Sequence, residues 1–341
     1  MSQGSTEIEL PEVDWKRETP VAFFIFKRPE TAARVFKAIS RARPKKLFII
    51  ADGPRKGRAD EEEACRQVRS LVETIPWDCE VLRNYAETNL GCNERISSGL
   101  GWLFKHVEEA IILEDDCLPS PSFFRFAEEM LERYRDHPRI FNICGAHCIP
   151  FSSFSSKESY FFSTSFAVWG WATWRRAWKY FPGIEPESVR SALPFKETAS
   201  AINAVSATPR VRRHFLQILR LISQGKAAGI TWDYIWGLTC LKNQGLSIRP
   251  RRNLISNIGF AHGATNPADP SSPANNFPLD SLSFPLTHPS SISVDKAQDL
   301  SLELNFPPPR NLEWKLQAKI LLPTGIYLKM RDAFRFMKRV F

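Results

Sequence analysis

Residues 110–126 read AIILEDDCLPSPSFFRF, and this stretch decides the fold that we expect. Its apolar start, 110–113, predicts a buried strand, and three acids follow at 114–116 without a break. Ser120 is suited to cap a helix, and Pro121 suits the first turn of that helix. A buried strand that ends in acids and leads into a helix is typical of an α/β domain, with the acids delivered to one end of a sheet.

The segments before this stretch repeat the alternation of strand and helix. Three apolar runs predict strands, and a helical pattern follows each of them; the runs are VAFFIFKRPE (21–30), KKLFIIADGPR (45–55) and CEVLRN (79–84). Strands that are apolar throughout are buried on both faces, which is typical of parallel sheets. The expected fold class is therefore α/β, a mainly parallel sheet sandwiched by helices.

Charged side chains fall where these strands end. Arg28 follows the first strand, Asp52 the second, and Glu114, Asp115 and Asp116 the fourth. Ligands of open sheets gather beyond the carboxyl ends of the strands, so we expect these side chains to cluster. Adjacent carboxylates repel one another unless a cation lies between them, and hard divalent cations prefer oxygen ligands. The pattern predicts a site for Mn²⁺ or Mg²⁺ and a diphosphate; the alternative is an exposed acidic turn.

Two further polar residues each allow two interpretations. Asp233 lies in ITWDYIW (230–236), framed by bulky apolar side chains. It is either a helix cap or a general base in a partly dry environment, and the pattern supports both equally. His262 lies between glycines in NIGFAHGAT (257–265) and is either a surface or hinge residue or a contact to phosphate or metal.

Tryptophans crowd residues 169–178. Trp171, Trp174 and Trp178 have helical spacing, and such a stripe belongs more often to a core than to a binding site. Because aromatic faces favour amphipathic ligands such as sugar rings, we keep Trp171 and Trp232 as candidate acceptor contacts.

Composition narrows the classes of function. With 43% hydrophobic and 24% charged residues, the 341-residue chain is ordinary for a globular protein, and its net charge of +9 suggests an anionic partner. Nucleic acid is not expected, because the aromatic residues lie in apolar runs and no zinc-finger or RNP-like pattern is present. The seven cysteines include no Cys-x-x-Cys pair, which favours reduced thiols in a cytosolic enzyme over a disulfide framework.

With these residues in place, the chain resembles the GT-A nucleotide-sugar transferases. More narrowly, it resembles N-acetylglucosaminyltransferase I and its bacterial relatives, which include haemolytic-protein-like sugar transferases. The resemblance runs from about residue 21 to 262 and is densest at ILEDDCLPSPSFFRF (112–126). Two further matches follow in order: the Gly170-Trp171 turn, and Trp232-Asp233 ahead of an aromatic-rich helix and Ile248-Arg249-Pro250.

This resemblance implies a GT-A fold and an inverting, metal-dependent sugar transfer. The donor would be a nucleotide-diphosphate sugar, with a UDP-sugar favoured, and the acceptor a hydroxyl of a glycan or a lipid-linked glycan. The implied site consists of Asp116 as the Mn²⁺ ligand, Glu114 and Asp115 at the sugar and ribose, Asp52 at the base, Arg28 near the nucleotide and Asp233 as the catalytic base.

Two rival functions come from other classes. A sugar-phosphate nucleotidyltransferase has a similar sheet and acids, but its first strand normally leads into a Gly-rich, basic loop. The corresponding segment here, FKRPETAAR (26–34), contains no glycine. A non-catalytic basic binding protein would show clustered Lys and Arg with exposed aromatic residues between them.

The expected organisation is a polar leader over 1–18, a GT-A domain over 19–262, a Pro/Ser-rich flexible loop or linker over 263–306 and a basic amphipathic extension over 307–341. The leader shows no signal pattern and no apolar run approaches the roughly 18 residues of a spanning helix, so we expect a cytoplasmic protein. In the tail, 311–341, seven bases and two acids lie among apolar residues. This pattern suits a helix on the anionic inner face of the plasma membrane; the alternative is a terminal helix docked on the domain.

We expect the full chain to sediment with anionic vesicles and a chain ending near Asn311 to stay in the supernatant. The reason is that each base adds about 1 kcal/mol near such a surface. Co-sedimentation at low and high salt measures this difference, and neutral vesicles are the control. Equal partitioning of the two chains would contradict the prediction.

Overall fold

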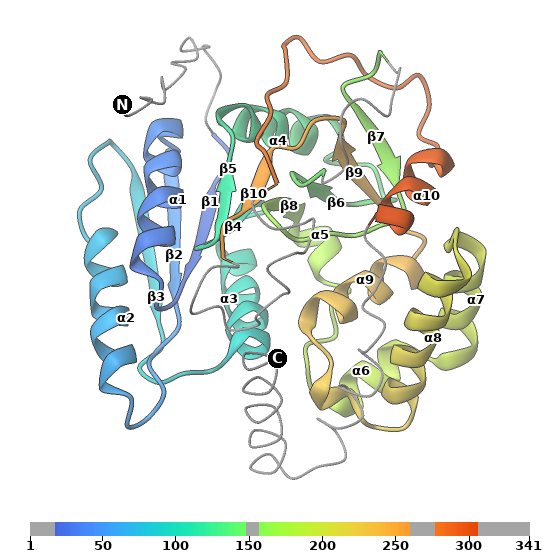
Figure 1. The fold of residues 1–341 in the computed structure, drawn as a ribbon, viewed down its shortest axis with the longest axis horizontal. Coiled ribbons are helices and arrows are strands. Elements are labelled where there is room, and N and C mark those ends of the chain that lie inside the picture. The colour runs from blue at the N-terminus through green and yellow to red at the C-terminus, as the bar shows by residue number, and fades with distance from the viewer. Residues whose placement is uncertain (1–17, 148–156, 260–276, 306–341) are drawn as a thin grey trace, which may run out of the picture.

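One mixed sheet of eight strands runs through the computed structural model, which describes residues 18–147, 157–259 and 277–305 (Figure 1). In chain order the strands of this sheet are β1 (Val21–Ile25), β2 (Lys46–Ala51), β3 (Glu80–Tyr85), β4 (Glu109–Glu114), β6 (Ile140–Cys144), β7 (Tyr160–Ser163), β8 (Trp171–Trp174) and β9 (Leu246–Pro250). A separate antiparallel pair is formed by β5 (Cys117–Pro119) and β10 (Ile255–Asn257).

Helices cover both faces of the sheet. They are α1 (Pro29–Ala42), α2 (Ala59–Leu71), α3 (Cys92–His106), α4 (Pro121–Arg133), α5 (Arg175–Trp178), α6 (Pro186–Ala192), α7 (Phe195–Val205), α8 (Pro209–Ser223), α9 (Trp232–Lys242) and α10 (Lys296–Asn305), with a short 3₁₀ turn, η2 (Ala227–Gly229). The predicted class, α/β with a mainly parallel sheet between helices, is confirmed.

The strand order is β3-β2-β1-β4-β8-β6-β9-β7. The first four are parallel, β8 is antiparallel to both of its neighbours, β9 is parallel to β6, and β7 is an antiparallel edge strand. From β1 the chain moves outward to β2 and β3, and after α3 it returns to the other side of β1 as β4. The carboxyl ends of β1 and β4 therefore border a topological switch point, where open sheets bind their ligands.

Alternation along the strands divides the core into two layers. Val21, Phe23 and Ile25 of β1 point to one face, where they pack with α1, α2 and α4. Ala22 and Phe24 point to the other face, where they pack with α3, α5 and α9. Every residue of β1 is buried, because helices lie on both sides of it.

A third layer forms beyond α9. The helices α6, α7 and α8 pack around the outer side of α9, with Val189, Ile202, Ile218 and Ile235 among the buried residues. Figure 1 shows this group to one side of the sheet, beneath α10. Because α9 is buried on both its sheet side and its outer side, eight of its 11 residues are buried, and its first turn is held in place.

Two expectations from the sequence need correction here. The helical spacing of Trp171 and Trp174 is misleading, because both lie in β8, between β4 and β6. Residues 277–305 are not a free linker: Leu286 is buried in the core, and Val294 forms a parallel bridge with Phe162 before α10 begins. Single apolar anchors hold this segment, and they leave no periodic pattern to detect. The rest of the predicted linker, the leader up to residue 17 and the extension from 306 lie outside the described residues.

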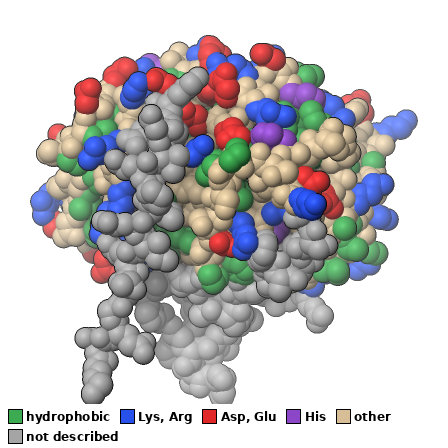
Figure 2. All heavy atoms as spheres, turned by 90° about the horizontal axis from the view of Figure 1, so that it is seen from above, with side chains coloured by type: hydrophobic (Ala, Val, Ile, Leu, Met, Phe, Trp, Pro, Cys, Tyr) green, Lys and Arg blue, Asp and Glu red, His purple; other side chains and the backbone are tan. Residues whose placement is uncertain are grey.

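Acidic and basic side chains are interspersed over the face of the molecule seen from above (Figure 2). Although the chain carries a net charge of +9, this face shows both positive and negative side chains. Among the helices of the described residues, none combines the length and the apolar character needed to cross a bilayer.

Candidate active site

The site is built where β1 and β4 end side by side. Strand pairing puts Phe24 opposite Glu114, so the residues that follow each strand emerge at the same edge of the sheet. The Arg28 guanidinium, after β1, pairs with Asp116 and lies 3.5 Å from the Asp115 carboxylate, after β4. The predicted meeting of Arg28 with the acidic triplet is observed in the structure.

Asp115 is the most firmly held acid of the triplet. Its carboxylate accepts a hydrogen bond of 3.0 Å from the backbone N–H of Phe26, in addition to its contact with Arg28. Burial raises the pKa of Asp115, and the Arg28 charge and the Phe26 bond oppose that rise. With its oxygens directed at β1, Asp115 joins the two strand ends.

Asp116 is packed between Arg28 and the segment after β10. Its backbone carbonyl accepts from the N–H of Ile258 at 2.8 Å. A Cβ placed on Gly259 would lie 2.3 Å from the Asp116 Oδ2 and 2.7 Å from its Cβ, so only glycine fits at that position. The antiparallel pair of β5 and β10 brings Gly259 to this place, across about 140 residues of chain.

Glu114 differs from its two neighbours. No protein donor to its carboxylate occurs within the described part of the chain, although the residue is only partly exposed. Desolvation and the negative charges of Asp116 and Asp115 raise the pKa of Glu114, and Arg28 opposes the rise. An unsatisfied, crowded carboxylate of this kind is typical of a ligand-binding position.

Asp233 joins the same site from the other half of the fold. It lies in the first turn of α9, where the positive end of the helix dipole favours a carboxylate. Desolvation nevertheless raises the pKa of Asp233, opposed by hydrogen bonds from the Thr231 side chain and from backbone N–H groups. Asp233 is close enough to Glu114 to raise the pKa of Glu114 as well. The structure therefore places Glu114 of β4 and Asp233 of α9 near each other, although they are 119 positions apart in the chain.

The acids fit a divalent cation that arrives together with a phosphate ligand. Glu114 and Asp116 offer carboxylate oxygens, the ligands that hard cations prefer, and a cation would oppose the desolvation and negative charges that raise the pKa of Glu114. Within residues 18–147, 157–259 and 277–305 there is no preformed group of three or more side chains set for a metal. Magnesium-like ions are commonly held by one or two carboxylates plus substrate phosphates, and this arrangement matches that mode.

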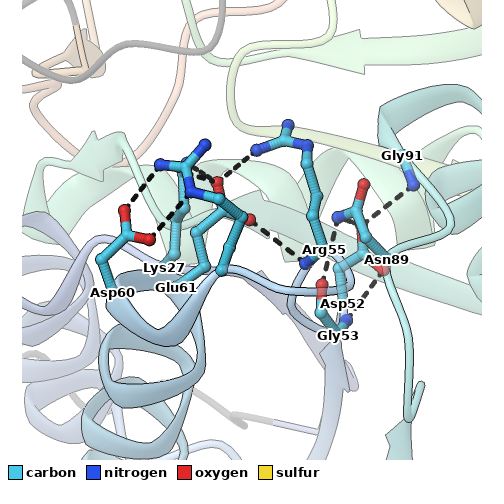
Figure 3. Close-up of polar contacts among 9 residues, drawn as sticks. Lys27, Asp52, Gly53, Arg55, Asp60, Glu61, Asn89 and Gly91 are labelled. Carbon is cyan, nitrogen blue, oxygen red and sulfur yellow. Dashed lines mark hydrogen bonds and ion pairs between the residues drawn. The ribbon is translucent and has the colours of Figure 1, made fainter.

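Asp52 organises a loop at the same edge. Only 4% exposed, it accepts from the Asn89 amide at 2.8 Å, from the N–H of Gly53 at 2.9 Å and from the N–H of Gly91 at 3.1 Å (Figure 3). A fourth hydrogen bond, of 2.9 Å, comes from the N–H of Leu90. A carboxylate has about four acceptor positions, and protein donors take all four. The contact of Asp52 with a nucleotide base stays a prediction, whereas its hold on residues 89–91 is observed.

A second polar cluster next to Asp52 ties β1 and β2 to α2. The buried carboxylate of Glu61 accepts from the Lys27 ammonium at 2.6 Å and from the N–H of Arg55 at 3.2 Å, and Arg58 is paired with Asp60 beside it (Figure 3). Burial alone would raise the pKa of Glu61, but the bonds from Lys27 and Arg55 outweigh it and lower that pKa. These charges are largely neutralised within the cluster.

The two candidate acceptor tryptophans lie in the core. Trp171 is 1% exposed and Trp232 is 3% exposed; their ring centroids are 5.9 Å apart, and Trp178 and Trp236 surround them. This burial leaves no open ring face for a sugar to stack on, so the structure supports the core interpretation. His262 lies outside the described residues.

Cys92 and Asn93 belong to the site but were missed from the sequence. Cys92 is an exposed residue that begins α3, and crowding of its thiol by neighbouring atoms together with the charges of Glu114 and Asp233 raises its pKa. Its thiol therefore stays protonated and is a poor nucleophile. Their place in the chain could have indicated them: the loop before α3 follows the parallel strand β3 and so lies at the same edge of the sheet as the acids.

The similarities of this chain to known proteins are distant. No protein family and no curated protein matches the sequence. Among solved structures, the chain is similar to mannosyltransferase PcManGT from Pyrobaculum calidifontis in complex with GDP-Man and Mn²⁺, with a TM-score of 0.36 and 13% identity over 67% of this chain and 74% of that one. It is also similar to a UDP-glucose pyrophosphorylase complexed with UDP-glucose, with a TM-score of 0.25 and 12% identity over 44% of this chain and 64% of that one.

We expect Asp116→Ala to abolish the binding of UDP that depends on Mn²⁺, because an oxygen ligand at the end of β4 is lost. Since the cation shares its ligands with the phosphates, Mn²⁺ alone should bind the wild-type chain weakly. Isothermal titration calorimetry with Mn²⁺, UDP and both together measures this. The control is Glu108→Ala, which removes an exposed acid at the opposite end of the same strand. Unchanged affinity in Asp116→Ala would refute the assignment.

We expect Gly259→Ala to displace the Asp116 carboxylate and to weaken the same binding about fivefold or more. The added methyl group has no room beside Asp116, and overpacking of this kind costs about 1–3 kcal/mol. Gly101→Ala in α3 is the matched control, since a Cβ there meets nothing within 4 Å. The packing argument fails if the two variants bind alike.

Proposed function

We propose that this chain is a GT-A type glycosyltransferase, which moves a sugar from a nucleotide-diphosphate donor to a hydroxyl of a glycan or lipid-linked acceptor. A UDP-sugar is the favoured donor, and the transfer inverts the anomeric configuration. The observation that carries the proposal is that Asp233 lies in the first turn of α9, whose start is hydrogen-bonded to Asn93 of α3 at the sheet edge where Arg28 pairs with Asp115 and Asp116. A desolvated carboxylate facing a diphosphate site is the arrangement that a displacement assisted by a general base requires.

The two halves of the site divide the work. Arg28, beside Asp115 and Asp116, offers guanidinium N–H groups to the phosphates, and Glu114 offers an unpaired carboxylate to hydroxyls of the donor. On the other side, Asp233 takes the proton from the acceptor hydroxyl as its oxygen attacks the anomeric carbon. Its raised pKa brings its basicity nearer to the working pH, where a general base is most effective.

A divalent cation, Mn²⁺ or Mg²⁺, would be held by Asp116 and would supply positive charge to the diphosphate as it leaves. The remaining work on the leaving group falls to Arg28, which is already at the ends of both strands. The hydrogen bond from the Phe26 N–H keeps the Asp115 carboxylate in place beside Arg28.

We expect Asp233→Asn to bind donor almost as the wild type does and to lose nearly all transfer, since only the proton acceptor changes. A well-placed general base contributes about 10²- to 10⁴-fold, so kcat should fall by that factor. Turnover with a panel of nucleotide sugars and glycan acceptors measures kcat, and calorimetry measures donor binding. Tyr234→Phe is the matched control, because it removes one hydrogen bond, to His214, on the same helical turn.

The outcome of that experiment separates several alternatives. More than about a tenth of wild-type turnover in Asp233→Asn would remove the general-base role. A product that keeps the donor's anomeric configuration, detected by NMR, would remove the inverting mechanism. Release of pyrophosphate from a nucleoside triphosphate and a sugar phosphate, in place of sugar transfer, would identify a nucleotidyltransferase instead.

A further inference from the structure

Asn93, in the first turn of α3, forms hydrogen bonds to the backbone of the segment that precedes Asp233. Its amide N–H donates to the carbonyl of Ile230 at 2.9 Å, and its amide oxygen accepts from the N–H of Trp232 at 3.0 Å. One side chain thus makes two hydrogen bonds to the backbone of a segment nearly 140 residues away in sequence, in the pattern of a paired strand. The second of these bonds ends one residue before Asp233.

These bonds satisfy groups that the helix itself leaves open. The first N–H groups of any α-helix have no partner within the helix, and Trp232 is the first residue of α9. The side chain of Thr231, at the N-cap position, accepts no capping hydrogen bond. Asn93 therefore performs from another helix the task that an N-cap residue usually performs locally. The position of the first turn of α9, and of Asp233 within it, depends on α3.

Asp52 holds the loop that leads into α3 and so to Asn93. Three of the four hydrogen bonds to Asp52 come from residues 89–91, and the carbonyl of Gly91 accepts from the N–H of Arg95 in the first turn of α3. The hydrogen bonds of Asp52 and those of Asn93 are thus joined through the short covalent segment 89–93, which connects the carboxyl end of β2 to the start of α9. This connection crosses from the half of the sheet that carries Arg28 and Asp52 to the half that carries Asp233.

We propose that Asn93 is a positioning residue for catalysis, which holds the Asp233 carboxylate against the site through its two backbone hydrogen bonds, with Asp52 fixing the loop from which Asn93 acts. This inference rests on the proposed function, because it concerns the base of that reaction. The role of Asp52 in this proposal is structural, since all of its acceptor positions are occupied by protein donors. Displacement of a reacting group by about 1 Å is enough to cost about 10²-fold in rate.

The test is a double-mutant cycle of Asn93→Ala and Asp233→Asn in the full-length protein. We expect Asn93→Ala to lower kcat about 10- to 100-fold while the KM for the donor changes less than threefold, because the donor half of the site is untouched. In the Asp233→Asn background, the same substitution should have little further effect, since it acts through Asp233.

The matched control is Asn243→Ala, at the other end of the same helix. The Asn243 amide donates to the carbonyl of Thr239 at 2.8 Å, so this variant also loses a hydrogen bond of an asparagine amide to the backbone. It should lower the thermal stability to a similar extent and leave kcat close to that of the wild type. If Asn93→Ala does not fold, Asn93→Ser, which keeps a small polar group, is put through the same cycle.

Each outcome distinguishes the two proposals. High residual turnover in Asp233→Asn overturns the proposed function, and the inference falls with it. A low turnover in Asp233→Asn with wild-type kcat in Asn93→Ala overturns the inference alone. Fully additive losses, or a fall in kcat for Asn243→Ala as large as that for Asn93→Ala, would show that Asn93 only stabilises the fold.

Discussion

The ion pairs of Arg28 with Asp115 and Asp116 join the carboxyl ends of β1 and β4, and the arrangement of the site depends on them. Without the guanidinium, two adjacent carboxylates and the nearby Glu114 would repel one another in surroundings that exclude much of the water. Removing one partner of a buried ion pair leaves the other charge uncompensated, which costs about 3–5 kcal/mol in known cases. The hydrogen bond from Phe26 to Asp115 anchors the whole group to the backbone of β1.

The charge balance of this edge explains why it is suited to a ligand. Arg28 neutralises part of the acidic charge, and the raised pKa values of Glu114 and Asp233 show that the rest is unfavourable as the protein stands. Beside it, the cluster around Glu61 is already neutralised by Lys27 and Arg55. The carboxylates with raised pKa values are thus Glu114, at the end of β4, and Asp233, at the start of α9. A ligand that brings a positive charge, or a hydroxyl that can give up a proton, is stabilised beside them.

The two halves of the fold are joined through backbone contacts made by polar side chains. Asp52 fixes the loop before α3, and Asn93 fixes the start of α9. Apolar packing alone lets a helix shift slightly as side chains rearrange. Two hydrogen bonds to one backbone segment are directional and fix the position of that segment. The buried tryptophans Trp171 of β8 and Trp232 and Trp236 of α9 pack together in the core on this side of the sheet.

The sequence by itself determined the first four strands, the helices that follow them and the acids at the end of β4, because local patterns carry that information. An apolar run of four to six residues, a Ser-Pro helix start and three consecutive acids are visible without any long-range contact. The strand-end rule also predicted that Arg28 and Asp115 would meet, since parallel neighbours end at one edge. Only the tertiary structure decided which partners those side chains have. It gave the three donors that residues 89–91 supply to Asp52, the burial of Trp171 and Trp232, the contact of Gly259 with Asp116 and the hydrogen bonds of Asn93 to the start of α9. Each of these depends on segments 30 to 140 residues apart, and the order in which strands enter a sheet fixes such contacts without leaving a periodic trace in the chain.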